Sequence, residues 1–115
     1  MLTIYHNGEC SKSRGALELL IENNIPHKVR FYIAEPLSKD ELKALLAKLG
    51  MKAQDIVRKN ETLYKEQYEG REISNEEWID ILATNPVLLE RPIVENEETA
   101  IIARPPERAL EMAAI

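Results

Sequence analysis

Cys10 is the only cysteine among the 115 residues, and its position suits a nucleophile. The preceding residues 2–5 are typical of a short strand, and residues 11–24 that follow are typical of a helix. The polar turn His6–Cys10 therefore delivers the thiol to the N-terminal end of that helix. Unpaired backbone N–H groups and the positive end of the helix dipole favour a thiolate there, and the same groups bind oxyanions.

Polar and charged neighbours of Cys10 strengthen the interpretation that it is reactive. His6 if protonated, Lys12 and Arg14 lie within four residues and would lower the pKa of the thiol by charge. The Ser13 hydroxyl is placed to donate to the thiolate. The alternatives are a small buried hydrophobic cysteine, a histidine bonded only to backbone, and an ordinary serine of the first helical turn.

Length and composition predict one globular domain spanning residues 1–115, since domains commonly contain about 100–150 residues. The chain is 44% hydrophobic and 30% charged, with a net charge of −5 and no lysine–arginine cluster, which argues against a nucleic-acid partner. No apolar run approaches the roughly 18 residues of a membrane span. With one cysteine and no export signal, we expect a protein of the reducing cytoplasm.

The first half of the chain predicts a βαβ unit followed by helices. After the strand and helix already described, residues 27–33 carry the β-branched and aromatic residues of a second strand, which should lie parallel to the first. Ser38 and Glu41 form a capping box for a helix that Gly50 ends. Residues 62–69 and 74–84 are two further helices, and Trp78 is expected in the core.

The end of the chain returns to strands. Residues 93–94 and 99–103 are expected to be two short strands joined by an acidic turn, and Pro105–Pro106 to start a terminal helix. The order is therefore β-α-β, a helical insert at about 37–89, then β-β-α. This order predicts an α/β fold with a mixed sheet.

This element order, with a cysteine at the first strand–helix junction, resembles the thioredoxin fold. Within that fold the chain resembles the glutaredoxin-coupled arsenate reductase family. The resemblance rests on four segments in the family's order and at nearly its spacing, and it spans essentially the whole chain. They are His6–Arg14 (HNGECSKSR), Arg58–Glu61 (RKNE), Glu90–Val94 (ERPIV) and Arg104–Glu107 (RPPE).

The resemblance implies that Arg58, Arg91 and Arg104 converge on a tetrahedral oxyanion beside Cys10. Arginine suits this task because its fork donates paired hydrogen bonds and stays protonated. Taken singly, each of these arginines would be interpreted as a solvated surface residue. The resemblance also implies that Arg14 supports the loop or contacts the anion, and that Pro92 is cis.

A single cysteine cannot resolve its own covalent arsenic adduct, so the electrons must come from outside the chain. The resemblance implies glutathione and then glutaredoxin as partners, with no bound cofactor. The implied cycle is thiolate attack on arsenate, a glutathione mixed disulfide at Cys10, release of arsenite, and regeneration of the thiol. No metal site is expected, because one cysteine and the distant His6 and His27 offer no ligand set.

Three departures from the family pattern leave the physiological substrate open. Gly8 stands in place of a usual proline, Lys12 in place of a frequent threonine, and Gly15 in place of a typical asparagine. One alternative is a glutathione-dependent thiol-disulfide oxidoreductase on the same fold. Another is an Spx-type redox regulator that binds RNA polymerase, which Ser13 disfavours because those proteins commonly carry a second cysteine at that position.

Overall fold

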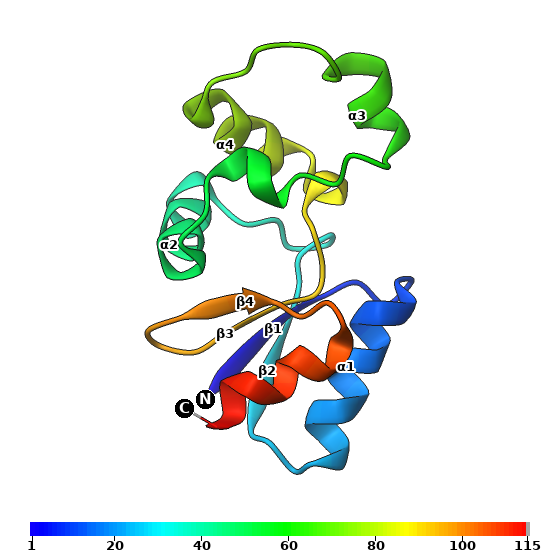
Figure 1. The fold of residues 1–115 in the computed structure, drawn as a ribbon, viewed down its shortest axis with the longest axis vertical. Helices are drawn as coiled ribbons and strands as arrows, with labels where there is room; N and C mark the ends of the chain where they lie inside the picture. The colour runs from blue at the N-terminus through cyan, green and yellow to red at the C-terminus, as the bar shows by residue number, and fades with distance from the viewer. Residues whose placement is uncertain (115) are drawn as a thin grey trace. The chain divides into compact units, whose positions relative to one another are not determined.

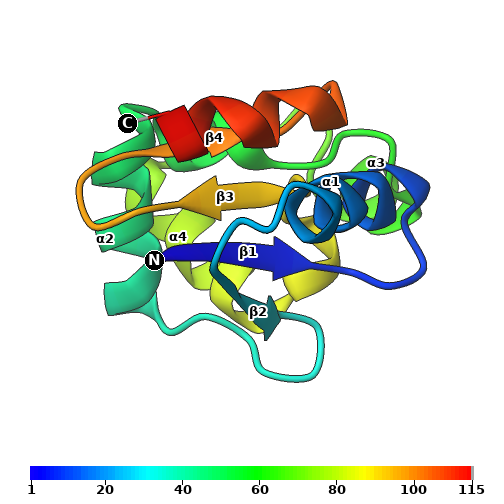
Figure 2. The same cartoon turned by 90° about the horizontal axis from the view of Figure 1, so that it is seen from below.

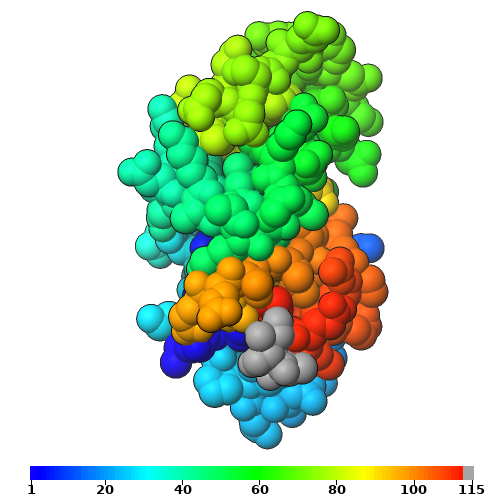
Figure 3. Space-filling model, turned by 60° about the vertical axis from the view of Figure 1, so that its left-hand side comes forward, coloured from blue at the N-terminus to red at the C-terminus, as the bar shows by residue number. Residues whose placement is uncertain are grey.

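The computed structural model describes residues 1–114, and the chain divides into two compact units (Figure 1). The sheet unit consists of Met1–Glu35 together with the C-terminal segment from Arg91 onward, and the helical unit consists of Pro36–Glu90. The space-filling view in Figure 3 shows blue N-terminal and orange-to-red C-terminal segments forming one body in the sheet unit. Both ends of the chain therefore build the part that holds Cys10.

The sheet has four strands in the order β2-β1-β3-β4. They are β1 (Leu2–His6), β2 (His27–Phe31), β3 (Ile93–Glu95) and β4 (Ala100–Ile102). The strand β1 pairs with β2 in parallel and with β3 antiparallel, and Figure 2 shows the arrows of β1 and β3 pointing in opposite directions. The pair β3–β4 is also antiparallel. The predicted α/β fold with a mixed sheet is confirmed, as is the parallel βαβ unit.

The core of the sheet unit lies between the sheet and two helices, α1 (Ser11–Glu22) and the 3-10 helix η3 (Pro106–Ala114). These helices lie side by side in Figures 1 and 2. Eight buried residues from both ends of the chain form the core cluster: Leu2, Ile4, Ala16, Leu20, Val94, Ala103, Ala109 and Met112. Ideal Cβ geometry at Gly15 would place that atom 3.5 Å from Pro106 Cγ, so α1 and η3 approach closely. The expected terminal helix is present, but its turns are of the tighter 3-10 type.

Three elements of the sheet unit are shorter than the sequence predicts, and one of them is β4, which covers Ala100–Ile102 of the expected residues 99–103. The helix α1 ends at Glu22 because the chain turns at Asn24, whose φ is 54°, and Ile25 N–H then bonds to Leu20 O at 3.0 Å. The strand β2 ends at Phe31, where a turn begins and Glu35 N–H bonds to Phe31 O at 2.9 Å. Asparagine tolerates the left-handed region, so the end of α1 has a cause in the local sequence.

The helical unit contains α2 (Lys39–Leu49), η1 (Ala53–Ile56), α3 (Thr62–Gln67), α4 (Asn75–Thr84) and η2 (Pro86–Leu88). The capping box of Ser38 and Glu41 is confirmed, and Gly50 ends α2 with a φ of 67°. The expectation that Trp78 is a core residue is also confirmed, because it is buried and packs against the rings of Tyr64 and Tyr68.

Candidate functional site

Cys10 is the N-cap residue of α1, with φ −97° and ψ 120°. The loop from the end of β1 is held by Asn7, whose carbonyl accepts from Cys10 N–H at 3.0 Å and whose Oδ1 accepts from Glu9 N–H at 3.0 Å. The thiol is free and half-buried. Cys10 is therefore fixed by its backbone while its sulfur stays within reach of a ligand.

Several opposing effects act on the thiol, and together they place the pKa of Cys10 below its ordinary value. Burial alone raises this pKa, because a charged sulfur is less well solvated there. The backbone N–H of Ser13, the guanidinium of Arg91 and the backbone N–H of Lys12 lower it by stabilising the thiolate. Arg91 lies eighty-one positions after Cys10 in the sequence, so the fold brings this cation to the thiol.

His6 and Ser13 form a buried pair beside the loop. His6 Nδ1 lies 2.7 Å from Ser13 Oγ, which also accepts from Asn7 N–H at 3.1 Å. The Ser13 hydroxyl is thus bonded to His6 and Asn7, whereas the sequence suggested that it would donate to the thiolate; the Ser13 backbone N–H acts on the sulfur in its place. The imidazole of His6 also packs edge-on against Phe31, with ring centroids 5.8 Å apart.

Burial lowers the pKa of His6 below 6.5, and the charge of Arg14 lowers it further, although a bond to Ser13 acts in the opposite direction. His6 is consequently neutral for the most part at neutral pH. The sequence predicts an effect of His6 on the thiolate only when this residue is protonated, and that contribution stays a prediction for lower pH. The described geometry makes His6 a brace of the loop through Ser13.

Arg14 and Lys12 act on the loop in different ways. Arg14 Nη1 donates to Gly8 O at 2.8 Å, which ties the first turn of α1 back to the chain before Cys10. Of the two roles open to Arg14 in the sequence, this geometry is that of loop support. Lys12 affects the thiol through its backbone N–H.

Arg91 and Arg104 lie with Cys10 in the sheet unit. Arg104 Nε donates to Arg91 O at 2.8 Å, and Ala103 N–H donates to Pro92 O at 2.9 Å. The Arg91–Pro92 peptide bond is cis, as the resemblance implied. Arg104 is thereby joined to the segment that presents Arg91 to the sulfur.

Arg58 lies in the helical unit and is described within it. Its N–H donates to Leu88 O at 2.7 Å, and its side-chain Nε lies 3.2 Å from Glu61 Oε1. Among the residues that the structure describes, the buried Nη1 atom of Arg58 has no hydrogen-bond partner. The guanidinium thus keeps a buried N–H donor that no described residue uses.

Two residues of these loops were not singled out from the sequence. Asn7 organises the turn before Cys10, and its signal is an asparagine before a glycine, which is typical of a turn. Glu61 pairs with Arg58, and its signal is an acidic residue three positions after an arginine. Spacing of that kind is common on any surface, so it does not identify a site.

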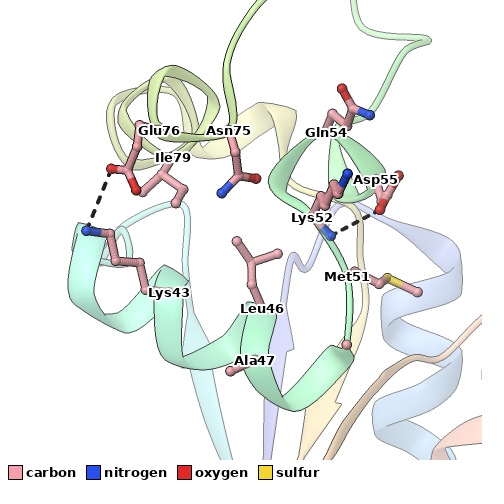
Figure 4. A pocket seen from close by; sticks show the side chains of 11 residues that line it. Lys43, Leu46, Ala47, Met51, Lys52, Gln54, Asp55, Asn75, Glu76 and Ile79 are labelled. Carbon is pink, nitrogen blue, oxygen red and sulfur yellow. Dashed lines mark hydrogen bonds and ion pairs between the residues drawn. The ribbon is translucent and has the colours of Figure 1, made fainter.

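The helical unit also contains a pocket of about 660 Å³ between α2, η1 and α4 (Figure 4). Leu46 and Ile79 give it an apolar floor, and Lys43 at its edge pairs with Glu76 at 3.7 Å. None of the residues proposed from the sequence lines it. Over residues 1–114 the structure shows no group of three acidic, histidine or cysteine side chains fit for a metal, and no helix long and apolar enough to cross a membrane.

Comparisons with known proteins point in one direction. The model of the ArsC family matches residues 5–112. The chain is 44% identical over 111 residues to the protein YfgD of Escherichia coli, covering 95% of this chain and 93% of that one. It is 40% identical to an arsenate reductase of Neisseria meningitidis, covering 92% of each chain. The solved structure of an arsenate reductase from Vibrio cholerae matches with a TM-score of 0.91 at 40% identity, covering 96% of each chain.

Proposed function

Because this chain belongs to the ArsC family, the arsenate reductase family, we propose that it reduces arsenate to arsenite with Cys10 as the nucleophile. One observation carries the proposal. The half-buried sulfur of Cys10 has a pKa below its ordinary value because backbone N–H groups and the Arg91 guanidinium stabilise the thiolate more than burial destabilises it. A thiolate next to a cation is what attack on an oxyanion requires.

Arg58, Arg91 and Arg104 are proposed to bind the substrate. Arsenate is a tetrahedral anion that a thiolate repels, unless several cations offset the negative charges of both groups. Arginine supplies this charge together with directional hydrogen bonds. The unpartnered Nη1 of Arg58 and the backbone bond that holds Arg104 to the Arg91 segment support these assignments.

The chemistry proceeds through one covalent adduct. The Cys10 thiolate attacks arsenic, forming a sulfur–arsenic bond while one arsenate oxygen leaves as water after protonation. The thiolate of glutathione then attacks the Cys10 sulfur, and the electron pair of the sulfur–arsenic bond passes to arsenic, which leaves as arsenite. Two thiols are oxidised to a mixed disulfide, and arsenic gains two electrons.

The remaining step regenerates the free thiol. A thiolate of glutaredoxin attacks the glutathione sulfur of the mixed disulfide, which releases Cys10 as a thiolate. Cys10 is the only cysteine of the chain, so no internal thiol competes for this step. A cycle that consumes glutathione requires a reducing compartment, so the proposal places the enzyme in the cytoplasm.

The test is turnover of arsenate by the wild type and by Cys10→Ser in parallel. NADPH oxidation is followed in the presence of glutathione, glutaredoxin and glutathione reductase, with and without arsenate. We expect arsenate-dependent oxidation only with the wild type. A wild type that reduces a small disulfide but leaves arsenate unchanged would contradict the proposal in favour of a general thiol oxidoreductase.

A further inference from the structure

We infer that Glu61 is a positioning residue for substrate binding, because it holds the Arg58 guanidinium by one edge and leaves another edge for the oxyanion. The inference rests on the proposed function, since it takes Arg58 to be an oxyanion ligand. It adds a second residue, of opposite charge to the first, to the substrate-binding role proposed for Arg58.

The geometry of the pair is that of a brace. Glu61 Oε1 lies 3.2 Å from Arg58 Nε, and the side chains of Arg58 and Glu61 are 16% and 26% exposed, respectively. The backbone closes the same turn, because Glu61 N–H donates to Arg58 O at 3.3 Å. Glu61 is also the N-cap residue of α3, so its own backbone is fixed by the helix that follows.

The backbone around Arg58 is also held by hydrogen bonds. Arg58 N–H donates to Leu88 O at 2.7 Å, and the neighbouring Val57 and Leu89 form an isolated antiparallel bridge. The segment Leu88–Glu90 leads directly into Arg91 along the chain. Arg58 is therefore held by its backbone on one side and by its Nε on the other.

Guanidinium chemistry explains why the contact at Nε matters. The five N–H donors of arginine lie in one plane, so fixing Nε fixes the directions in which Nη1 and Nη2 donate. The Nη1 atom of Arg58 is buried and has no hydrogen-bond partner among the described residues. A side chain ordered before the ligand arrives loses less conformational entropy when it binds.

The carboxylate of Glu61 also has an opposite effect, because its negative charge repels an anionic ligand. The two effects can be separated by substitution. Glu61→Gln keeps an oxygen acceptor for Nε but removes the charge, whereas Glu61→Ala removes both. Positioning predicts that the alanine variant binds the anion least well, while a pure charge effect predicts that both variants bind it more tightly than the wild type.

The experiment measures the Kd of arsenate by titration calorimetry in the Cys10→Ser background, where no turnover occurs. We expect binding about two- to fivefold weaker in Glu61→Ala, which lies within the range for a surface ion pair, and Glu61→Gln to bind more tightly than Glu61→Ala. In an Arg58→Ala background, Glu61→Ala should have no further effect. Glu66→Ala is the matched control, because it removes the same charge from an exposed position of α3.

Three results overturn the inference alone while Arg58→Ala still weakens binding. They are unchanged or tighter binding in Glu61→Ala, equal binding in Glu61→Ala and Glu61→Gln, and a loss in Glu61→Ala that persists without Arg58. A fourth result, arsenate binding that Arg58→Ala leaves unaltered, overturns the inference together with the proposed role of Arg58. Thermal unfolding of each variant, measured alongside, identifies a loss that comes from unfolding.

Discussion

The reactivity of Cys10 depends on a balance between burial and a small number of donors. Burial alone would hold the sulfur as a neutral thiol, and only the N–H groups of the first helical turn and the Arg91 guanidinium reverse that effect. The helix contribution is local to the sequence around Cys10. The Arg91 guanidinium comes from a distant part of the chain, so a single substitution can remove its effect on the pKa of Cys10.

We predict that Arg91→Ala raises the pKa of Cys10, because the substitution removes a hydrogen bond and a positive charge from the thiolate. Alkylation of Cys10 by iodoacetamide, followed as a function of pH, reports the thiolate fraction. The curve should rise with pH and reach a plateau in both proteins, but at higher pH in the variant. Arg108→Ala, which removes an arginine already paired with Glu111 in the same unit, is the control. Superimposable curves for Arg91→Ala and wild type would show that Arg91 does not stabilise the thiolate.

We predict that His6 makes the protein less stable in acid. Its pKa is lowered in the folded protein, mainly by burial, so the unfolded chain takes up this proton at higher pH. The stabilising contribution is therefore complete above about pH 6.5 and is lost as the pH falls through the folded pKa. Urea unfolding between about pH 7.5 and pH 5 should show a smaller loss of stability in His6→Gln.

The control for this prediction is His27→Gln, which removes the other histidine of the chain from a position bonded to Ile25 O. If His6→Gln and the wild type lose stability in parallel over this pH range, groups other than His6 account for the acid sensitivity. Neither substitution alters Cys10, so the role of His6 in supporting the loop is tested with the nucleophile intact.

At the scale of elements, the site depends on α1 starting at one particular residue. If the helix began one turn later, the N–H groups of Lys12 and Ser13 would no longer stabilise the sulfur. Several contacts set this start: the Asn7 turn, the Arg14 bond to Gly8 O and the His6–Ser13 pair. Gly15 weakens the same turn, because glycine is a poor helix former.

We predict that Gly15→Ala stabilises the protein by about 0.5–1 kcal/mol. The added methyl group would meet Pro106 Cγ at 3.5 Å, an ordinary van der Waals contact, so the gain in helix propensity is not offset by a clash. Gly50→Ala is the contrasting variant, since its φ of 67° is strained for alanine, and it should destabilise by about 1 kcal/mol. Urea unfolding measures both, and a Gly15→Ala protein less stable than wild type would show that α1 and η3 have no room for the methyl group.

The elements follow from the sequence where their signals are local. Ser38, Glu41 and Gly50 determine α2 through side-chain caps and a left-handed residue, and the structure has all three features. The 3-10 character of η3 has no comparable local signal in the sequence. The ends of β2 and α1 were misjudged by two residues each, since a turn can stop an element whose propensity continues.

At the scale of the whole molecule, the local sequence pattern placed Cys10 at a helix N-terminus, whereas only the resemblance placed Arg91 near it. The N–H groups of α1 follow from the strand–turn–helix pattern, whereas the effect of Arg91 on the thiol requires β3 to lie beside β1. The Arg58–Glu61 pair is close in sequence, but the buried Nη1 atom of Arg58, which suggests a ligand, is visible only in the structure. The spacing of residues along a chain does not specify which distant strands pair, so it could not place Arg91 beside the thiol.

We predict that arsenate stabilises the Cys10→Ser protein against heat through arginines of both units. A ligand that binds only the folded state contributes about 2.7 kcal/mol at about 100 times its Kd, and losing one ligating arginine weakens this at a given concentration. Arg58→Ala and Arg104→Ala should therefore each reduce the arsenate-induced rise in Tm, although they lie in different units. Arg71→Ala and Arg108→Ala, which remove exposed arginines from the helical and the sheet unit, should leave the rise unchanged. A rise that depends on Arg104 but not on Arg58 would confine the anion site to the sheet unit and remove the helical unit from substrate binding.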